Sequence, residues 1–159
     1  MTRAVRLAGL LYATAIGGYL LDRVTKLWVE GSLAGRPPIR VIPGVLHLTY
    51  TTNSGGAFGL GQSAPLLFAS ATIVVAGVIV AASLRLGRPL VAVALGSVLG
   101  GALGNLTDRA VNGSGLSGRV TDFIDFRIWP VFNVADSTIV VGAVLLALAS
   151  VLREDEGKA

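Results

Sequence analysis

Four long apolar stretches, separated by polar segments, dominate the pattern of hydrophobic and polar positions along this chain. They cover about residues 5–29, 64–84, 90–107 and 132–152. A helix needs roughly 17 to 25 mainly apolar residues to cross the hydrocarbon core of a bilayer, so each stretch is long enough to span one. The pattern therefore predicts one membrane-embedded, all-α domain over residues 1–159, built on four transmembrane helices.

The first stretch follows Arg3 and Arg6, an arrangement that is also found at the start of secretory signal peptides. No A-x-A cleavage site follows it, however, and the stretch continues through Asp22 and Lys26 to Trp28. We therefore interpret this stretch as a retained first span.

Four spans place both termini on one side of the membrane and the two long loops, at about residues 30–63 and 110–131, on the other. Basic residues are nearly balanced between the two sides. Those on the side of the termini lie close to the span ends, where the positive-inside rule has most force. We therefore expect cytoplasmic termini and two extracytoplasmic loops.

The first outer loop contains a strand-like segment, residues 39–50, that is rich in Val, Ile, Leu, Thr and Tyr. Pro43-Gly44 interrupts this segment, which is typical of a turn between two short strands. We therefore expect a small extracytoplasmic β-cradle in the first outer loop. His47, the single histidine of the chain, lies in this segment, and we interpret it as structural.

Composition agrees with a chain whose main solvent is lipid. Hydrophobic residues make up 53% and charged residues 14%, against about 25% charged residues in a typical soluble domain. The mean hydropathy is +0.73. The formal net charge of +4 fits basic residues that meet anionic head groups. No basic run or aromatic-basic motif indicates a nucleic-acid partner.

Two ionisable residues lie within the first span. At about 1.5 Å rise per residue, the apolar residues that precede Asp22 place it below the outer interface. Lys26 follows one helical turn later on the same face. The sequence leaves two interpretations open: an ion pair that neutralises itself in lipid, or a pair that shapes a functional site.

The third span carries a glycine at every fourth position, at Gly96, Gly100 and Gly104. Such a stripe allows neighbouring helices to approach closely. Asn105, Asp108 and Arg109 follow, and spacings of three and four residues place them on one helix face. The side chain of Arg109 alone could extend to the lipid head groups. That would account for one polar residue on this helix face, but not for three.

Further acids lie near the start of the fourth span. Asp122 and Asp125 are flanked by apolar residues, and burial would raise the pKa of such carboxylates. The alternative for this segment is a strand or turn on the surface. Asp136 follows Asn133 by three residues, which is the pattern of ordinary helix capping. An acid about one turn into an apolar span also marks a functional site, so both interpretations stay open.

Elimination narrows the possible chemistry. One histidine cannot supply an H-E-x-x-H zinc site, a Ser-His pair has no G-x-S-x-G setting, and the chain contains no cysteine. The glycine-rich segment 51–59 lacks the Lys-Ser/Thr of a phosphate loop. Several carboxylates, together with Asn and Arg side chains, gather at one membrane face. Two carboxylates that share a proton can activate water and protonate a leaving amine without metal or cofactor.

Five motifs, in this order, resemble the lipoprotein signal peptidase (signal peptidase II) family over nearly the whole chain. They are Asp22 with Lys26, and residues 53–58, 100–109, 120–126 and 132–137. Each motif is weak by itself, but five in the right order on the right spans are specific. Gly56 stands where the family often has Ala, Thr121 stands where Val is common, and the segment from Asp122 to Asp136 is short for the family.

The resemblance implies an aspartic endopeptidase with Asp122 and Asp136 as its catalytic pair, and Arg109 on a substrate carbonyl. The other residues that it implies for substrate binding or support are Asn53, Gly55, Asn105, Asp108, Asn133, Asp22 and Lys26. The substrate would be a prolipoprotein whose cysteine already carries diacylglycerol, cut just before that cysteine. We expect no metal or cofactor, and a monomer in contact with lipid in the bacterial cytoplasmic membrane, with its active site at the extracytoplasmic face.

Two other classes of function remain open. A four-span transporter or channel subunit would carry polar groups through the full membrane depth, whereas the second span and the inner halves of the third and fourth carry almost none. A non-catalytic scaffold packed on the glycine stripe would leave Asp122 and Asp136 unexplained. Cleavage of a lipidated precursor by the purified protein separates a peptidase from both.

Overall fold

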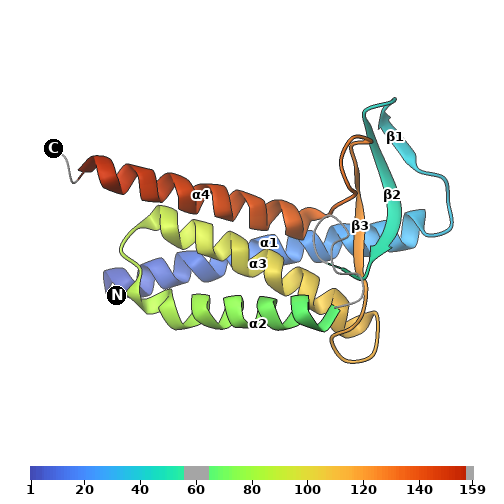
Figure 1. The fold of residues 1–159 in the computed structure, drawn as a ribbon. Coiled ribbons are helices and arrows are strands. Elements are labelled where there is room, and N and C mark those ends of the chain that lie inside the picture. The colour runs from blue at the N-terminus through green and yellow to red at the C-terminus, as the bar shows by residue number, and fades with distance from the viewer. Residues whose placement is uncertain (56–64, 157–159) are drawn as a thin grey trace.

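Four long helices form a bundle, with a small sheet at one end (Figure 1). The structure, a computed structural model, describes residues 1–55 and 65–156. The helices are α1 (Arg3–Leu33), α2 (Pro65–Ala82), α3 (Pro89–Val111) and α4 (Val134–Glu156). All four are long and apolar enough to cross a membrane, which confirms the predicted architecture. The N-terminus and the end of α4 lie together at the end of the bundle opposite the sheet.

The helix bounds differ from the apolar stretches by a few residues. α1 continues past residue 29 to Leu33, and α3 continues past residue 107 to Val111. Hydropathy marks how far a chain lies in lipid, whereas a helix ends where its backbone hydrogen bonding stops. α4 begins at Val134 rather than at residue 132 because Asn133 caps it. Between α2 and α3, a short 3₁₀ turn at Ser83–Arg85 completes the tight connection.

The sheet has three antiparallel strands in the order β1 (Ile39–Ile42), β2 (Leu46–Asn53) and β3 (Val120–Asp125). Gly44, with φ +75°, makes the turn between β1 and β2, as the sequence predicted. The small sheet predicted in the first outer loop is confirmed by β1 and β2, and a third strand, β3, joins it from the second loop. β3 is buried along almost its whole length. A short apolar segment of this kind does not show from sequence alone whether it joins a sheet.

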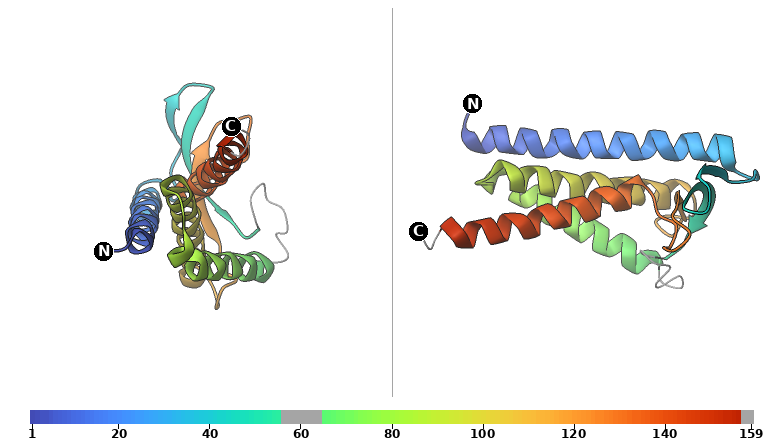
Figure 2. Two further views of the ribbon diagram at one scale, coloured as in Figure 1. Left: turned by 90° about the vertical axis from the view of Figure 1, so that its left-hand side faces the viewer. Right: turned by 90° about the horizontal axis from the view of Figure 1, so that it is seen from above.

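α3 is the central helix of the bundle and packs between α1 and α4 (Figure 2). A Cβ added at Gly100 would lie 3.1 Å from the Cα of Ala15 on α1, and one at Gly101 would press on Ile139 of α4. At Gly104 it would collide with the carboxylate of Asp22. The glycine stripe therefore brings α1 against α3 and leaves room for an acid at the sheet end, which confirms the predicted packing.

Candidate active site

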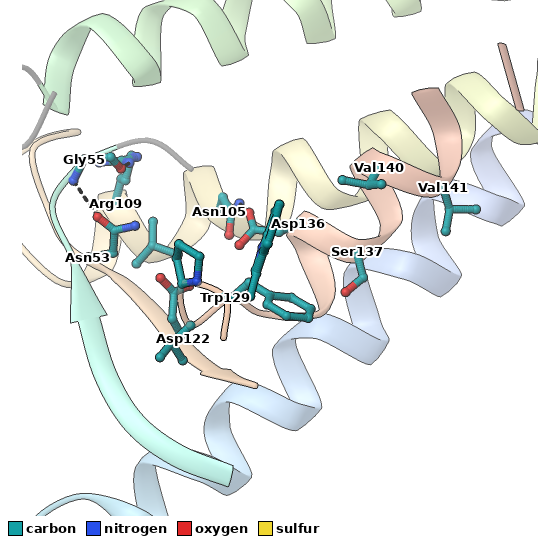
Figure 3. Close-up of a pocket in the computed structure, with 14 residues that line it drawn as sticks. Asn53, Gly55, Asn105, Arg109, Asp122, Trp129, Asp136, Ser137, Val140 and Val141 are labelled. Atoms are coloured by element: carbon teal, nitrogen blue, oxygen red, sulfur yellow. Dashed lines mark hydrogen bonds between the residues drawn. The ribbon is translucent and has the colours of Figure 1, made fainter. Parts of the chain in front are cut away.

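A cavity of about 440 Å³ lies where the C-terminal end of α3 and the N-terminal end of α4 meet the sheet (Figure 3). Its polar lining residues are Asn53, Asn105, Arg109, Asp122, Asp136 and Ser137, with the backbone of Gly55. Its apolar lining residues are Val120, Trp129, Pro130, Val131, Phe132, Val140 and Val141. Six of the ten site residues that the sequence predicted line this cavity, whereas Asp22, Lys26, Asp108 and Asn133 are not among its lining residues. The apolar wall was not predicted.

The two acids of this cavity come from different elements. Asp122 lies on β3, is 3% exposed and accepts a 2.6 Å hydrogen bond from Nδ2 of Asn133. Asp136 lies in the first turn of α4 and accepts a 2.8 Å hydrogen bond from Nδ2 of Asn105. Nδ2 of Asn133 also donates to Oδ1 of Asn105 at 3.2 Å, so two asparagines connect the two carboxylates.

Asn133 and Asp136 also form a reciprocal helix cap. The backbone N–H of Asp136 donates to Oδ1 of Asn133 at 2.9 Å, and the backbone N–H of Asn133 donates to Oδ2 of Asp136 at 3.4 Å. This is the geometry of a capping box. The two interpretations that the sequence left open are therefore compatible, because the cap holds Asp136 at the cavity.

Lys26 lies at the centre of a buried polar network beneath the acids. Its Nζ is 2.9 Å from Oδ1 of Asn105, 2.8 Å from Oδ2 of Asp22 and 2.9 Å from Oδ2 of Asp108. Lys26, Asp22 and Asp108 are fully buried. Oδ1 of Asp22 accepts a 2.9 Å hydrogen bond from the backbone N–H of Ala135, in the first turn of α4. The ion pair of the first span therefore supports the cavity floor as well as neutralising itself.

Asp108 ties β3 to the helices next to Asp122. It pairs with Arg23 and Lys26, and its Oδ2 accepts a 3.1 Å hydrogen bond from the backbone N–H of Thr121. The hydroxyl of Thr121 donates to Oε1 of Glu30 at 2.7 Å. Sequence reasoning missed Arg23 and Glu30 as supporting residues. Glu30 follows Asp22 and Lys26 at successive steps of four residues, so helical spacing could have indicated it.

Arg109 is 5% exposed and joins the residues that follow β2 to the residues just before β3. Its guanidinium donates to the carbonyls of Gly55 at 2.6 Å and of Ser54 and Gly118 at 3.3 Å each. Asn53 accepts a 2.8 Å hydrogen bond from the backbone N–H of Gly55. The predicted motif continues through residues 56–58, which lie outside the described residues.

The pKa of Asp122 is raised to about 7. Burial is the largest cause, and the neighbouring charge of Asp136 adds to it. Hydrogen bonds from Asn133 and Asn53 and the positive charge of Lys26 oppose the rise. Asp122 therefore holds a proton up to neutral pH, beside a second carboxylate, which is the protonation state that acid–base catalysis by a carboxylate pair needs.

Two other polar residues of the sheet stay away from this cavity. Asp125, the second acid of residues 120–126, pairs with Arg127 at 3.3 Å instead. His47 lines a different cavity. Within the described residues, no group of three His, Cys, Asp or Glu side chains is placed to hold a metal ion.

The sequence family model described as signal peptidase (SPase) II matches residues 14–152. This chain belongs to the signal peptidase II family. Similar curated proteins include the lipoprotein signal peptidase of Pelotomaculum thermopropionicum, 47% identical over 82% of this chain and 84% of that protein. That of Streptomyces coelicolor is 42% identical over 94% and 74%. A bacterial membrane enzyme solved at 2.3 Å superposes with a TM-score of 0.80, at 29% identity over 95% of this chain and 92% of that one.

These matches show that the fold described above is that of a family of multi-pass membrane peptidases. The matched region begins within α1 and ends within α4, so it includes every residue that lines the cavity. The predicted family and four-span architecture are confirmed.

Proposed function

We propose that this chain is an aspartic endopeptidase that removes signal peptides from diacylglyceryl-modified prolipoproteins, cutting before the lipidated cysteine. The observation that carries this proposal is the meeting of Asp122 and Asp136 in one cavity, one from strand β3 and the other from the first turn of helix α4. The names of the family's curated members support the substrate class.

The chemistry follows from one shared proton. Asp136, ionised, takes a proton from a water molecule as its oxygen attacks the scissile carbonyl carbon. Asp122, protonated, donates its hydrogen bond and then its proton to the carbonyl oxygen, which gives a neutral tetrahedral diol. When the C–N bond breaks, the proton on Asp136 passes to the leaving amine and a diol proton returns to Asp122. The pair thus regains its starting protonation state.

The neighbouring residues hold this pair in position. Asn105 and Asn133 each hold Oδ1 of one carboxylate, and Asn53 also donates a hydrogen bond to Asp122, so the two acids are held in a fixed position at the cavity. Arg109 fixes the carbonyls of Ser54 and Gly55, and so shapes the rim that an extended substrate backbone would follow. In this proposal Arg109 holds the backbone at the rim of the cavity in place. A direct hydrogen bond from Arg109 to the substrate carbonyl would use guanidinium N–H groups that do not already donate to Ser54, Gly55 or Gly118.

Cleavage of a lipidated precursor peptide by the purified protein in detergent tests the proposal. Asp122→Asn and Asp136→Asn should each lower kcat by a factor on the order of 10³ or more, because each removes a proton-transfer group, while both variants insert and purify normally. Near-normal turnover by either variant would contradict the assignment of Asp122 and Asp136 as the catalytic pair.

Asp108→Asn is the informative control for that experiment. It weakens the pairing with Arg23 and Lys26 but leaves both reacting carboxylates in place. We expect a large loss with measurable residual activity. Chelators should leave the unmodified enzyme active, and inhibition that added zinc reverses would contradict an aspartic mechanism.

A further inference from the structure

A second cavity, of about 620 Å³, lies on the sheet and shares no lining residue with the active-site cavity. It is lined by Pro37, Pro38, Arg40, His47 and Arg127, and we call it the arginine cavity. Three of its five lining residues carry basic side chains. The proposed peptidase chemistry uses none of them.

The basic residues are brought together by the pairing of the strands. Arg40 on β1 pairs across the sheet with His47 on β2, and His47 pairs with Asp125 on β3. Residues that are directly opposite on antiparallel strands point to the same face, so these side chains form one row. Arg127 follows two residues later and binds Asp125 through its backbone N–H at 2.8 Å and its guanidinium at 3.3 Å.

Three features of these residues are unusual. Arg127 has φ 64°, the one positive value among the described residues other than glycine, and such a conformation is rarely adopted by a residue with a side chain. Nε2 of His47 is buried and has no hydrogen-bond partner within the described part of the chain. Arg40 and Arg127 bring two positive charges against the single negative charge of Asp125. The cavity therefore has a surplus of positive charge.

By the length of α1 beyond Trp28, the arginine cavity lies near the outer limit of the lipid head-group layer. Trp28, half-exposed, marks the membrane interface on α1. α1 continues to Leu33, a further rise of about 7–8 Å at 1.5 Å per residue, and Pro37 and Pro38 follow shortly after. The head-group layer outside the hydrocarbon core is roughly 5–8 Å thick on each side. The sheet stands at this end of the bundle (Figure 1).

We propose that the arginine cavity binds the phosphate group of an anionic phospholipid head group. Guanidinium groups offer a planar pair of N–H donors that matches two phosphate oxygens, and Arg40 and Arg127 supply two such groups from opposite edges of the row. Free inorganic phosphate has the same chemistry, but the depth of the cavity favours a phosphate that is carried by a lipid.

Binding of short-chain phosphatidylglycerol to the purified full-length protein in neutral detergent tests this site. Phosphatidylcholine with the same acyl chains and inorganic phosphate are the two comparison ligands. Phosphatidylglycerol should bind with the lowest Kd. Arg40→Gln should raise that Kd about tenfold, since it removes a charged donor pair. Stronger binding of inorganic phosphate than of phosphatidylglycerol would overturn the lipid assignment.

Arg36→Gln is the matched control, because Arg36 lies in the exposed segment just before β1 and outside the cavity, and it donates to the carbonyl of Ser32. It removes the same charge and should change the Kd less than twofold. Equal effects of the two substitutions would mean general attraction to a basic surface and would overturn the site. The readout is lipid binding, so this test stands whether or not the proposed peptidase activity is found.

Discussion

The two residues of the acid pair, Asp122 and Asp136, are held in position in different ways. Asp136 is fixed by a helix cap that is local in sequence, whereas Asp122 is fixed by Asn133, eleven residues away, and by the strand that carries it. The cap could be predicted from residues 133–136 alone. The position of Asp122 depends on the pairing of β3 with β2, which no local pattern specifies.

The raised pKa of Asp122 predicts how activity depends on pH. Activity belongs to the form in which the pair shares one proton. Above a pH of about 7 the Asp122 carboxyl loses that proton, so kcat/KM should fall on the alkaline side, near the pKa given by burial and by Asp136. Below the pKa of the second carboxyl, both acids are protonated and no base remains, so activity should also fall at acid pH.

A pH–rate profile with a lipidated peptide in detergent measures both limbs, and protein stability must be checked at each pH. A flat profile from mildly acidic to strongly alkaline pH, with intact protein, would mean that no proton is shared. The groups of the buried network below the pair, Lys26 among them, affect where the limbs fall but do not remove them.

At the scale of elements, α3 shows what a sequence pattern can predict. The glycine stripe indicated close helix contact, and the structure confirms that α1 lies directly against it. The pattern did not indicate which helix would be the neighbour, because any span could have filled that groove. The same limit applies to the sheet: residues 39–50 indicated two strands, whereas the third strand depends on a contact between two loops.

Gly100→Ala should destabilise the protein by about 1–3 kcal/mol, as overpacking in a tight interface usually does. The new Cβ would lie 3.1 Å from the Cα of Ala15, and backbone atoms of α1 cannot move independently of the helix. Gly77→Ala on α2 is the matched control, since nothing lies within 4 Å of a Cβ there. It should be neutral or slightly stabilising. Thermal unfolding in detergent measures both, and equal Tm values for the two variants would contradict close packing at Gly100.

For the whole molecule, the orientation in the membrane is a further prediction. We expect the sheet and the acid pair outside the cytoplasm and both termini inside. The chain contains no cysteine, so a single introduced cysteine can be labelled without background from native cysteines. Gly31→Cys at the sheet end and Gly87→Cys at the opposite end both have open space at Cβ. In intact cells with a permeable outer barrier, an impermeant maleimide should label the first and reach the second only after membrane lysis; the reverse pattern would invert the orientation.

The shape of the whole site also predicts how strongly the enzyme depends on substrate lipid. Polar groups gather around the acid pair at one end of the cavity, and the wall formed by Trp129, Val140 and Val141 continues onto the face of α4 that is exposed to lipid. An acyl chain can follow this wall without leaving an apolar environment. Each buried CH₂ contributes roughly 0.8 kcal/mol, so even a few buried methylenes would change binding by orders of magnitude.

Two kinetic effects should follow when precursors with and without diacylglycerol on the cysteine are compared. Binding along the wall stabilises ground and transition states alike, so its main effect should be a lower KM for the lipidated precursor. Lipid also fixes the depth of the scissile bond opposite Asp122 and Asp136, so kcat should fall as well when the lipid is absent. Val140→Asn, which makes the wall polar one helical turn beyond Asp136, should raise KM for the lipidated precursor more than it lowers kcat. Equal cleavage of the two precursors by the unmodified enzyme would show that the apolar wall has no part in substrate recognition.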